Sequence, residues 1–147
     1  MKNFFKNKSL AFYLVCLAFV IGLANTVIYA CYSLNVNGKF GNHFNSLIFV
    51  LLLLGTVACI LPILKPNWKF TIIIPSALFS AAFGYYINDR LIMFEEMINK
   101  IYGMMESGAV LPMVILIFVL DVICIILTIV ASFLEFEKKN KKLEEAK

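Results

Sequence analysis

One acidic residue, Asp121, lies near the middle of the last long apolar stretch of the chain, residues 109–134. A charged carboxylate at the centre of a bilayer costs about 2.5–3.5 kcal/mol on insertion scales. None of the long apolar stretches contains Lys or Arg, so Asp121 has no ion-pair partner at its depth within one chain. We therefore expect its neutral acid form, which donates a hydrogen bond and needs an acceptor.

Polar residues at a similar depth in the other apolar stretches are candidate partners of Asp121. At 1.5 Å of rise per residue, Asp121 lies about 18 Å below the outer end of its stretch and Thr56 about 15 Å below its own. Ser80 lies about 15 Å above its inner end, where Asp121 is at about 19 Å, and Asn25 falls about a turn further out. Cys124, Thr128 and Ser132 lie on the same face of the helix as Asp121, and we expect this face to point inward.

Two interpretations of Asp121 remain open. A membrane-embedded acid can bind a proton or a cation and couple it to transport. A protonated Asp can instead hold helices together through a hydrogen bond, within one chain or between chains. Four short helices enclose little space for a substrate unless they oligomerise, so the sequence does not decide between the two.

Other residue types that could carry chemistry form only weak patterns. The four cysteines include no Cys-x-x-Cys pair, which is typical of small apolar core residues rather than of a zinc or redox site. His43 is the only histidine and has no triad pattern. Met93 and Met97, with three methionines nearby, resemble a Cu(I) site, but Met is also an ordinary filler of apolar helix faces. We predict no enzymatic activity, no metal and no cofactor.

The elements that position these residues are four apolar stretches, 10–32, 46–64, 70–87 and 109–134. A bilayer needs about 20 apolar residues per helix, and the hydrophobic fraction of 62% exceeds the roughly 45–50% of soluble domains. We predict an all-α membrane protein, a four-transmembrane-helix bundle forming a single domain over residues 1–147. The first stretch could also be a signal peptide, although it is longer than the roughly 7–15 residues of a signal core.

The distribution of lysines predicts the orientation of these stretches. Three lysines precede the first stretch, two flank the connection at 65–69, and five follow the fourth stretch. Because Lys and Arg concentrate on the cytoplasmic side, both termini and this connection are predicted inside. The Lys-, Asn- and Ile-rich composition favours a bacterial cytoplasmic membrane. The basic residues form no stripe with interleaved aromatics, so the net charge of +4 does not indicate nucleic-acid binding.

Two charged segments outside the apolar stretches are predicted to be helical. Over 89–105, apolar residues recur in steps of three and four, which predicts an amphipathic helix at the outer surface, as a connector or a lid. In the tail, 135–147, Glu135 and Lys139 form an i,i+4 pair, as do Glu137 and Lys141. Such pairs support a solvated helix on the cytoplasmic side.

Small residues mark the faces through which the helices are expected to pack. In lipid, helices associate by close packing across such residues. The third stretch carries Ser76, Ser80 and Gly84 in steps of four, and Gly22 and Gly55 lie in the first and second stretches. We predict that the third helix is central, contacted by at least two others, and that Gly84→Leu or Ser80→Leu forces the bundle apart.

These features favour a non-enzymatic integral membrane protein, an accessory or scaffold subunit that binds other membrane proteins or itself. The alternative is an oligomeric small transporter or channel that uses Asp121 for proton or cation coupling. In its size, its four stretches and its single membrane carboxylate the chain resembles the small multidrug exporters, although their acid lies in the first span. A third interpretation, a holin-like pore former, depends on size and the basic tail alone.

Overall fold

The computed structural model of the chain describes residues 9–34, 44–64, 69–91, 95, 98–99 and 111–134. The elements in these ranges are helices: α2 (Leu10–Leu34), α3 (Ser46–Ala58), α4 (Ile60–Leu64), the 3-10 helix η1 (Lys69–Ile72), α5 (Ile73–Asp89) and α7 (Leu111–Ser132). Three of the described segments are long and apolar enough to cross a membrane, namely Leu10–Ser33, Ser46–Leu64 and Pro112–Ser132. The predicted all-α class is confirmed, and α5 is a fourth helix beside these three.

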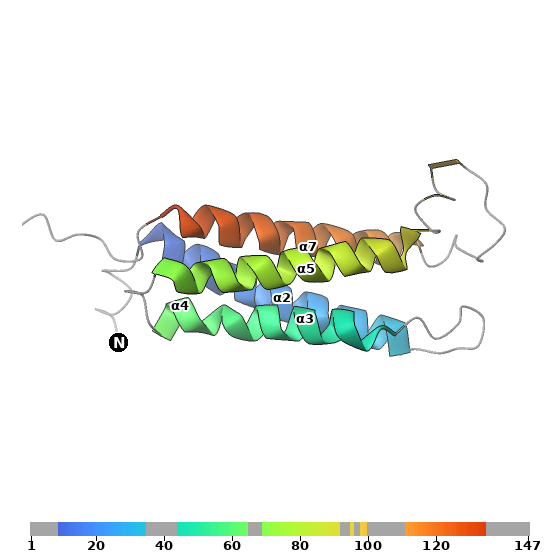
Figure 1. Ribbon diagram of the computed structural model, residues 1–147, viewed down its shortest axis with the longest axis horizontal. Coiled ribbons are helices and arrows are strands. Elements are labelled where there is room, and N and C mark those ends of the chain that lie inside the picture. The colour runs from blue at the N-terminus through green and yellow to red at the C-terminus, as the bar shows by residue number, and fades with distance from the viewer. Residues whose placement is uncertain are drawn as a thin grey trace, which may run out of the picture.

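The four long helices lie side by side along one axis, and successive helices run in opposite directions (Figure 1). α2 packs against α7 and α3, and α5 packs against the same two helices. The helices therefore form a ring in which each has two neighbours and α2 lies diagonally opposite α5.

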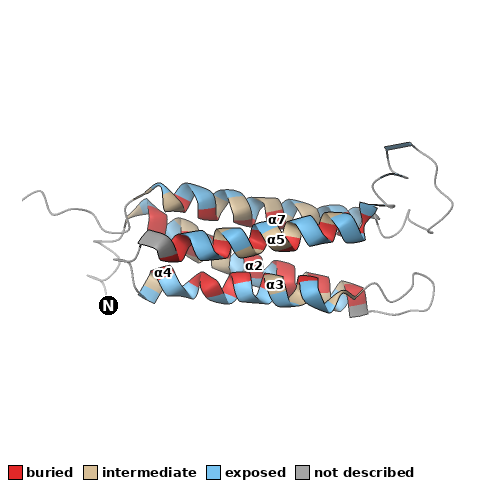
Figure 2. Cartoon of the chain, in the orientation of Figure 1, coloured by how far each residue is buried: buried red, intermediate tan, exposed pale blue. Residues whose placement is uncertain are grey.

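Buried positions recur along the helices in alternating steps of three and four. On α5 and the turn before it they are Ile72, Pro75, Phe79, Ala82 and Tyr86. On α7 they are Val114, Ile117, Asp121, Cys124, Thr128 and Ala131. This spacing keeps one seam of each helix turned toward its neighbours, as in coiled-coil packing. Figure 2 shows the buried residues distributed along the whole length of the bundle, beside exposed ones on the same helices.

Two prolines explain where the predicted stretches are interrupted. Pro62 has no N–H to donate to the carbonyl of Ala58, four residues earlier, and the stretch 46–64 divides at Cys59 into α3 and α4. Pro75 in the same way cannot donate to Thr71, and the turn before it is the 3-10 helix η1. The third stretch therefore begins with a tighter turn than an α-helix.

Two of the small residues of α5, Ser80 and Gly84, do not pack against the other described helices. Ser80 and Gly84 are exposed, and a Cβ built on Gly84 meets no atom within 4 Å. α5 does contact two long helices, as predicted, but its buried face carries Phe79 and Tyr86. The prediction that Ser80 and Gly84 form a packing seam within one bundle is wrong, because both are exposed. The predicted central position of the third helix is also wrong, because α5 has two neighbours in the ring like every other long helix.

Three predicted segments lie wholly or largely outside the described residues. Of the amphipathic helix at 89–105 the structure describes residues 89–91, 95 and 98–99, and of the first connection it leaves out 35–43. The tail, 135–147, also lies outside. The predictions for these segments stay predictions.

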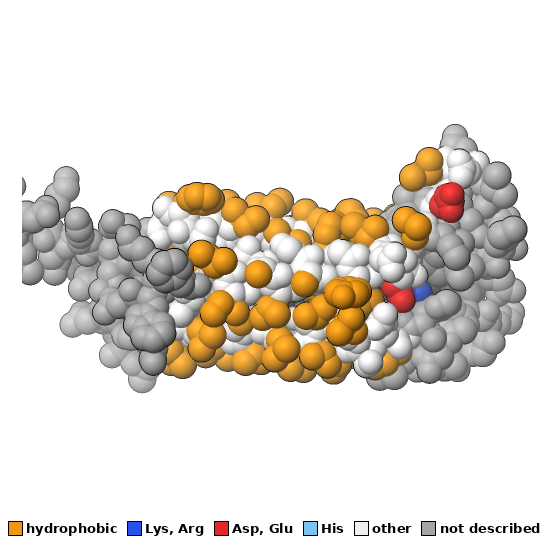
Figure 3. Space-filling view, in the orientation of Figure 1, with side chains coloured by type: hydrophobic (Ala, Val, Ile, Leu, Met, Phe, Trp, Pro, Cys, Tyr) orange, Lys and Arg blue, Asp and Glu red, His pale blue; other side chains and the backbone are white. Residues whose placement is uncertain are grey.

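A hydrogen-bonded cluster ties three helices together at one end of the bundle. The hydroxyl of Tyr29 on α2 donates to the carbonyl of Asn45 at 3.3 Å and accepts from its backbone N–H at 3.0 Å. The side-chain oxygen of Asn45 caps α3 by accepting from Leu47 N at 3.1 Å. Its amide donates to Asp89 Oδ1 at 3.4 Å, and Arg90 Nε lies 3.5 Å from Asp89 Oδ2. In Figure 3 the coloured charged side chains lie toward this end of the bundle.

Tyr29→Phe is expected to lower the free energy of unfolding by about 1 kcal/mol, because it removes both hydrogen bonds to the Asn45 backbone. The measurement is denaturant-induced unfolding of the full chain in detergent. Tyr85→Phe is the matched control, because Tyr85 is 50% exposed and is predicted to change little. Equal effects of the two substitutions would contradict a stabilising role for the Tyr29 hydroxyl.

Candidate functional site

The ring of Phe79 fills the centre of the bundle and reaches α2 across the diagonal. Phe79 is fully buried. A Cβ built on Gly22 of α2 would lie 2.9 Å from Phe79 Cζ and 2.9 Å from Thr56 Oγ1, and one built on Gly55 of α3 would lie 3.1 Å from two ring atoms. The two glycines therefore leave the space that the ring occupies. Both had been singled out in the sequence as small packing residues, and both lie at close contacts.

Asp121 lies at the same depth as this ring. The hydroxyl of Tyr86 on α5 donates to the carbonyl of Val114 on α7 at 3.1 Å, which sets the register of these antiparallel helices. Phe79 and Asp121 are each seven residues further along from that contact, and equal steps along neighbouring helices keep residues level. The central layer of the bundle thus contains Gly22, Thr56, Phe79 and Asp121.

The predicted inward face of α7 is observed. Asp121 is 2% exposed, and Cys124 and Thr128 are fully buried, whereas Ser132 at the helix end is partly exposed. Within the described part of the chain, Asp121 Oδ1 has no hydrogen-bond partner. A buried polar atom without a partner is unusual in a folded protein, so Asp121 stands out as the candidate functional group.

Two of the candidate partners of Asp121, Thr56 and Ser80, and Thr128 on the same helix face are bonded or placed elsewhere. Thr56 donates its hydroxyl proton to the carbonyl of Leu52 at 2.8 Å, and Thr128 donates to that of Cys124 at 2.8 Å. Ser80 is level with the site by depth, but it is exposed on the outer side of α5. In the described structure none of these three residues is hydrogen-bonded to Asp121 Oδ1.

Asn25 is the predicted partner that keeps its polar atoms available. It is fully buried, and neither Oδ1 nor Nδ2 has a hydrogen-bond partner among the residues that the structure describes. Asn25 lies on α2, which packs against α7. Asn25 and Asp121, on neighbouring helices, therefore both have buried polar atoms without a hydrogen-bond partner among the described residues.

Sequence reasoning missed the role of Phe79 and the pairing of two threonines. Ile72, Phe79 and Tyr86 recur every seven residues, a signal in the sequence that would have identified the buried face of α5. Thr26 Oγ1 lies 3.5 Å from Thr56 Oγ1, joining α2 to α3. Each threonine also donates to its own helix at 2.8 Å, Thr26 to the carbonyl of Gly22.

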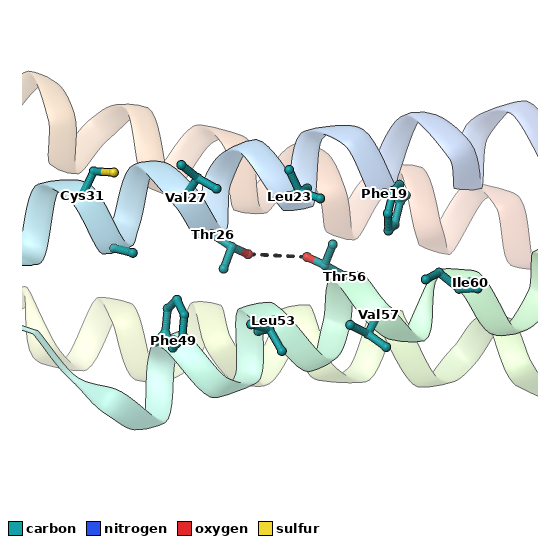
Figure 4. Close-up of a pocket in the computed structure, with 11 residues that line it drawn as sticks. Phe19, Leu23, Thr26, Val27, Cys31, Phe49, Leu53, Thr56, Val57 and Ile60 are labelled. Atoms are coloured by element: carbon teal, nitrogen blue, oxygen red, sulfur yellow. Dashed lines mark hydrogen bonds between the residues drawn. The ribbon is translucent and has the colours of Figure 1, made fainter.

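A groove of about 470 Å³ runs between α2 and α3, with this threonine pair beside it (Figure 4). Its walls are apolar except for the two hydroxyls and the thiol of Cys31. Because both hydroxyl protons already bond backbone carbonyls, the groove offers space for an apolar group rather than catalytic chemistry.

No group of three or more His, Cys, Asp or Glu side chains that could hold a metal ion occurs among the described residues. Comparison with protein families, with curated proteins and with solved structures gives no match.

Proposed function

We propose that the chain is a four-span integral membrane protein that acts as a scaffold or accessory subunit, and that it binds through the outer face of α5. With η1, α5 covers Lys69–Asp89, a length of about 30 Å at helical rise, which matches the hydrocarbon core. The exposed surface of the long helices is rich in large apolar side chains. Such a surface suits lipid and other membrane helices.

The observation that carries the proposal is the position of the small residues on α5. Ala77, Ser80 and Gly84 are exposed, and a shallow hollow of about 230 Å³ is lined by Ala81, Gly84, Tyr85 and Asn88. In lipid, a face of small residues lets another helix approach closely. Because α5 packs within the chain through its opposite face, this one is open to a helix of another membrane protein or of a second copy.

The orientation that we propose follows from the lysine distribution. The N-terminal segment, the connection at 65–69 and the C-terminal tail carry ten lysines in total, and such residues favour the cytoplasmic side. We infer a bacterial cytoplasmic membrane with both termini inside. To test this orientation, Lys2→Cys and Lys147→Cys are each treated in intact cells with a thiol reagent that does not cross the membrane. We expect neither introduced cysteine to react.

Gly84→Leu is expected to weaken association about tenfold, or about 1.4 kcal/mol, while leaving the thermal stability of one chain unchanged. The leucine would keep a partner helix at a distance, whereas a Cβ built at this position meets no described atom within 4 Å. Energy transfer between labelled chains in liposomes, and co-purification with native membrane proteins, measure the association.

Val130→Leu is the matched control, because Val130 is 43% exposed on α7 and lies outside the proposed face. Unchanged association of the Gly84→Leu protein, both with itself and with co-purifying proteins, would count against the proposal. Loss of association with Val130→Leu as well would show that the face on α5 is not specific.

A second candidate function is an oligomeric transporter or channel that couples proton or cation movement to Asp121. The observation that favours it is the buried Asp121 Oδ1 without a partner among the described residues. Flux of protons or cations into liposomes that contain the purified protein tests it, with Asp121→Asn as the comparison. Flux that disappears in Asp121→Asn would favour transport over the scaffold function.

A further inference from the structure

We propose that Asp121 and Asn25 form one proton-binding site between α7 and α2, in which the neutral acid of Asp121 donates its O–H to the amide oxygen of Asn25. Both side chains are buried, and both have polar atoms without partners within the described ranges. The proposed scaffold function involves the outer face of α5 and neither of these two side chains, so the site does not depend on it.

The register of α2 and α7 places the two residues close in depth. Cys124 Sγ lies 3.8 Å from the carbonyl oxygen of Ala18, so these two residues are level. From this level, Asp121 lies three residues along α7, or about 4.5 Å. Asn25 lies seven residues along α2 in the same direction, or about 10.5 Å. The backbones of the two residues are therefore separated by about one helical turn.

The direction of the side chains reduces this separation. In an α-helix each Cα–Cβ bond tilts toward the helix N-terminus. Because α2 and α7 are antiparallel, Asn25 tilts toward the level of Asp121, and Asp121 tilts toward the level of Asn25. The two side chains therefore lean toward each other along the same seam.

The hydrogen-bonding groups of the two side chains are complementary when Asp121 is neutral. The acid offers one O–H donor and a carbonyl acceptor, and the amide offers a carbonyl acceptor and an NH₂ donor. An acid and an amide can exchange two hydrogen bonds, or be joined by one water that has these polar partners. Uptake converts the carboxylate and one proton from the aqueous phase into the acid, with no other reactant.

No described charged group lies near this site to hold Asp121 as a carboxylate. Arg90, the residue that follows α5, is eleven residues beyond the level of Phe79, about 16 Å along the bundle. The described side chains of η1, Thr71 and Ile72, do not titrate. The other buried or half-buried titratable side chains on the helices around Asp121 are thiols and phenols: Cys16, Tyr29 and Tyr32 on α2, Tyr86 on α5 and Cys124 on α7.

Solid-state NMR of the full chain in liposomes tests the proposal directly. Asp89 and Asp121 are the only aspartates of the sequence, so ¹³Cγ-Asp labelling gives two signals, and Asp89→Asn assigns them. At pH 7 we expect Asp121 to show the chemical shift of a protonated acid. With ¹⁵Nδ2-Asn labelling we also expect dipolar dephasing of Asp121 by a nearby amide nitrogen. The contact of Asp89 with the amide of Asn45 at 3.4 Å is the internal standard.

Asn25→Val should abolish the dephasing of Asp121 and leave that of Asp89 unchanged. A carboxylate shift for Asp121 at pH 7 in the unsubstituted protein would overturn the proposal without any variant being needed. Dephasing of Asp121 that survives Asn25→Val would also overturn it, because another amide would then be the partner. If Asn25→Val does not fold, Asn25→Gln replaces it. The sequence contains no glutamine, so ¹⁵N-labelled glutamine then marks position 25 alone. If the labelled amide does not dephase Asp121 in this variant, and labelled asparagine does not dephase it in the unsubstituted protein, the site is rejected.

Discussion

Gly22→Val is expected to destabilise the bundle more than any other conservative substitution on α2, by about 1–3 kcal/mol. Its Cβ alone would lie 2.9 Å from Phe79 Cζ and from Thr56 Oγ1, and two methyl groups extend the overlap. The ring cannot move away easily, because Gly55 of α3 is also packed against it. Unfolding of the full chain in detergent, followed by circular dichroism, measures the loss.

Gly84→Val is the matched control for this substitution, because a Cβ built at Gly84 of α5 meets no described atom within 4 Å, so the change should alter stability little. Phe79→Leu combined with Gly22→Val should recover part of the loss, since the smaller side chain makes room for the valine. Equal destabilisation by the Gly22 and Gly84 substitutions would show that the ring of Phe79 does not occupy the space beside Gly22.

The second large effect is expected for the two buried polar residues, Asn25 and Asp121. Asn25→Val and Asp121→Val should each cost about 1–3 kcal/mol, because each leaves the other residue buried without its partner. The double variant removes both polar groups, so it should cost less than the sum. Coupling energies of hydrogen bonds between membrane helices average about 0.6 kcal/mol and reach about 1.7 kcal/mol, and we expect a value in this range.

Thermal unfolding of the four proteins in the same detergent gives this double-mutant cycle. Thr128→Val supplies a comparison on α7, because the Thr128 hydroxyl bonds only to its own helix at Cys124 and Ile125 in the described structure. Additive losses for Asn25→Val and Asp121→Val would mean that the residues do not interact. If the coupling energy between Asn25→Val and Thr128→Val equals that between Asn25→Val and Asp121→Val, the coupling is not specific to Asp121.

The sequence predicted the positions of the long helices well because each follows a long apolar run. The first stretch, 10–32, corresponds to α2, and the fourth, 109–134, to α7. The second and third were each predicted as one helix, whereas the structure has a break at Cys59 and a 3-10 turn before Ile73. These departures come from Pro62 and Pro75. A proline leaves a backbone carbonyl without its helical donor, and this local effect cannot be seen in the length of an apolar run.

The packing faces were predicted less well, because two principles compete in lipid. Small residues permit close approach, which favoured the face of Ser80 and Gly84. Large rings placed against glycines give even more contact, and Phe79 with Gly22 and Gly55 follows this second arrangement. Depth along a helix is additive from one residue to the next, so Asp121 and Thr56 were placed in one layer. Rotation about the axis depends on every neighbour, so Ser80 was placed on the wrong side.

The ring of helices has a consequence for the order in which its contacts form. α2 meets α3, the next described long helix along the chain, across an open groove and a 3.5 Å hydroxyl contact. Its most extensive interface in the ring is instead with α7, the described long helix that lies farthest from it in sequence. Because contacts between segments far apart in sequence slow folding, we expect the closing of the ring between α2 and α7 to be the slow step.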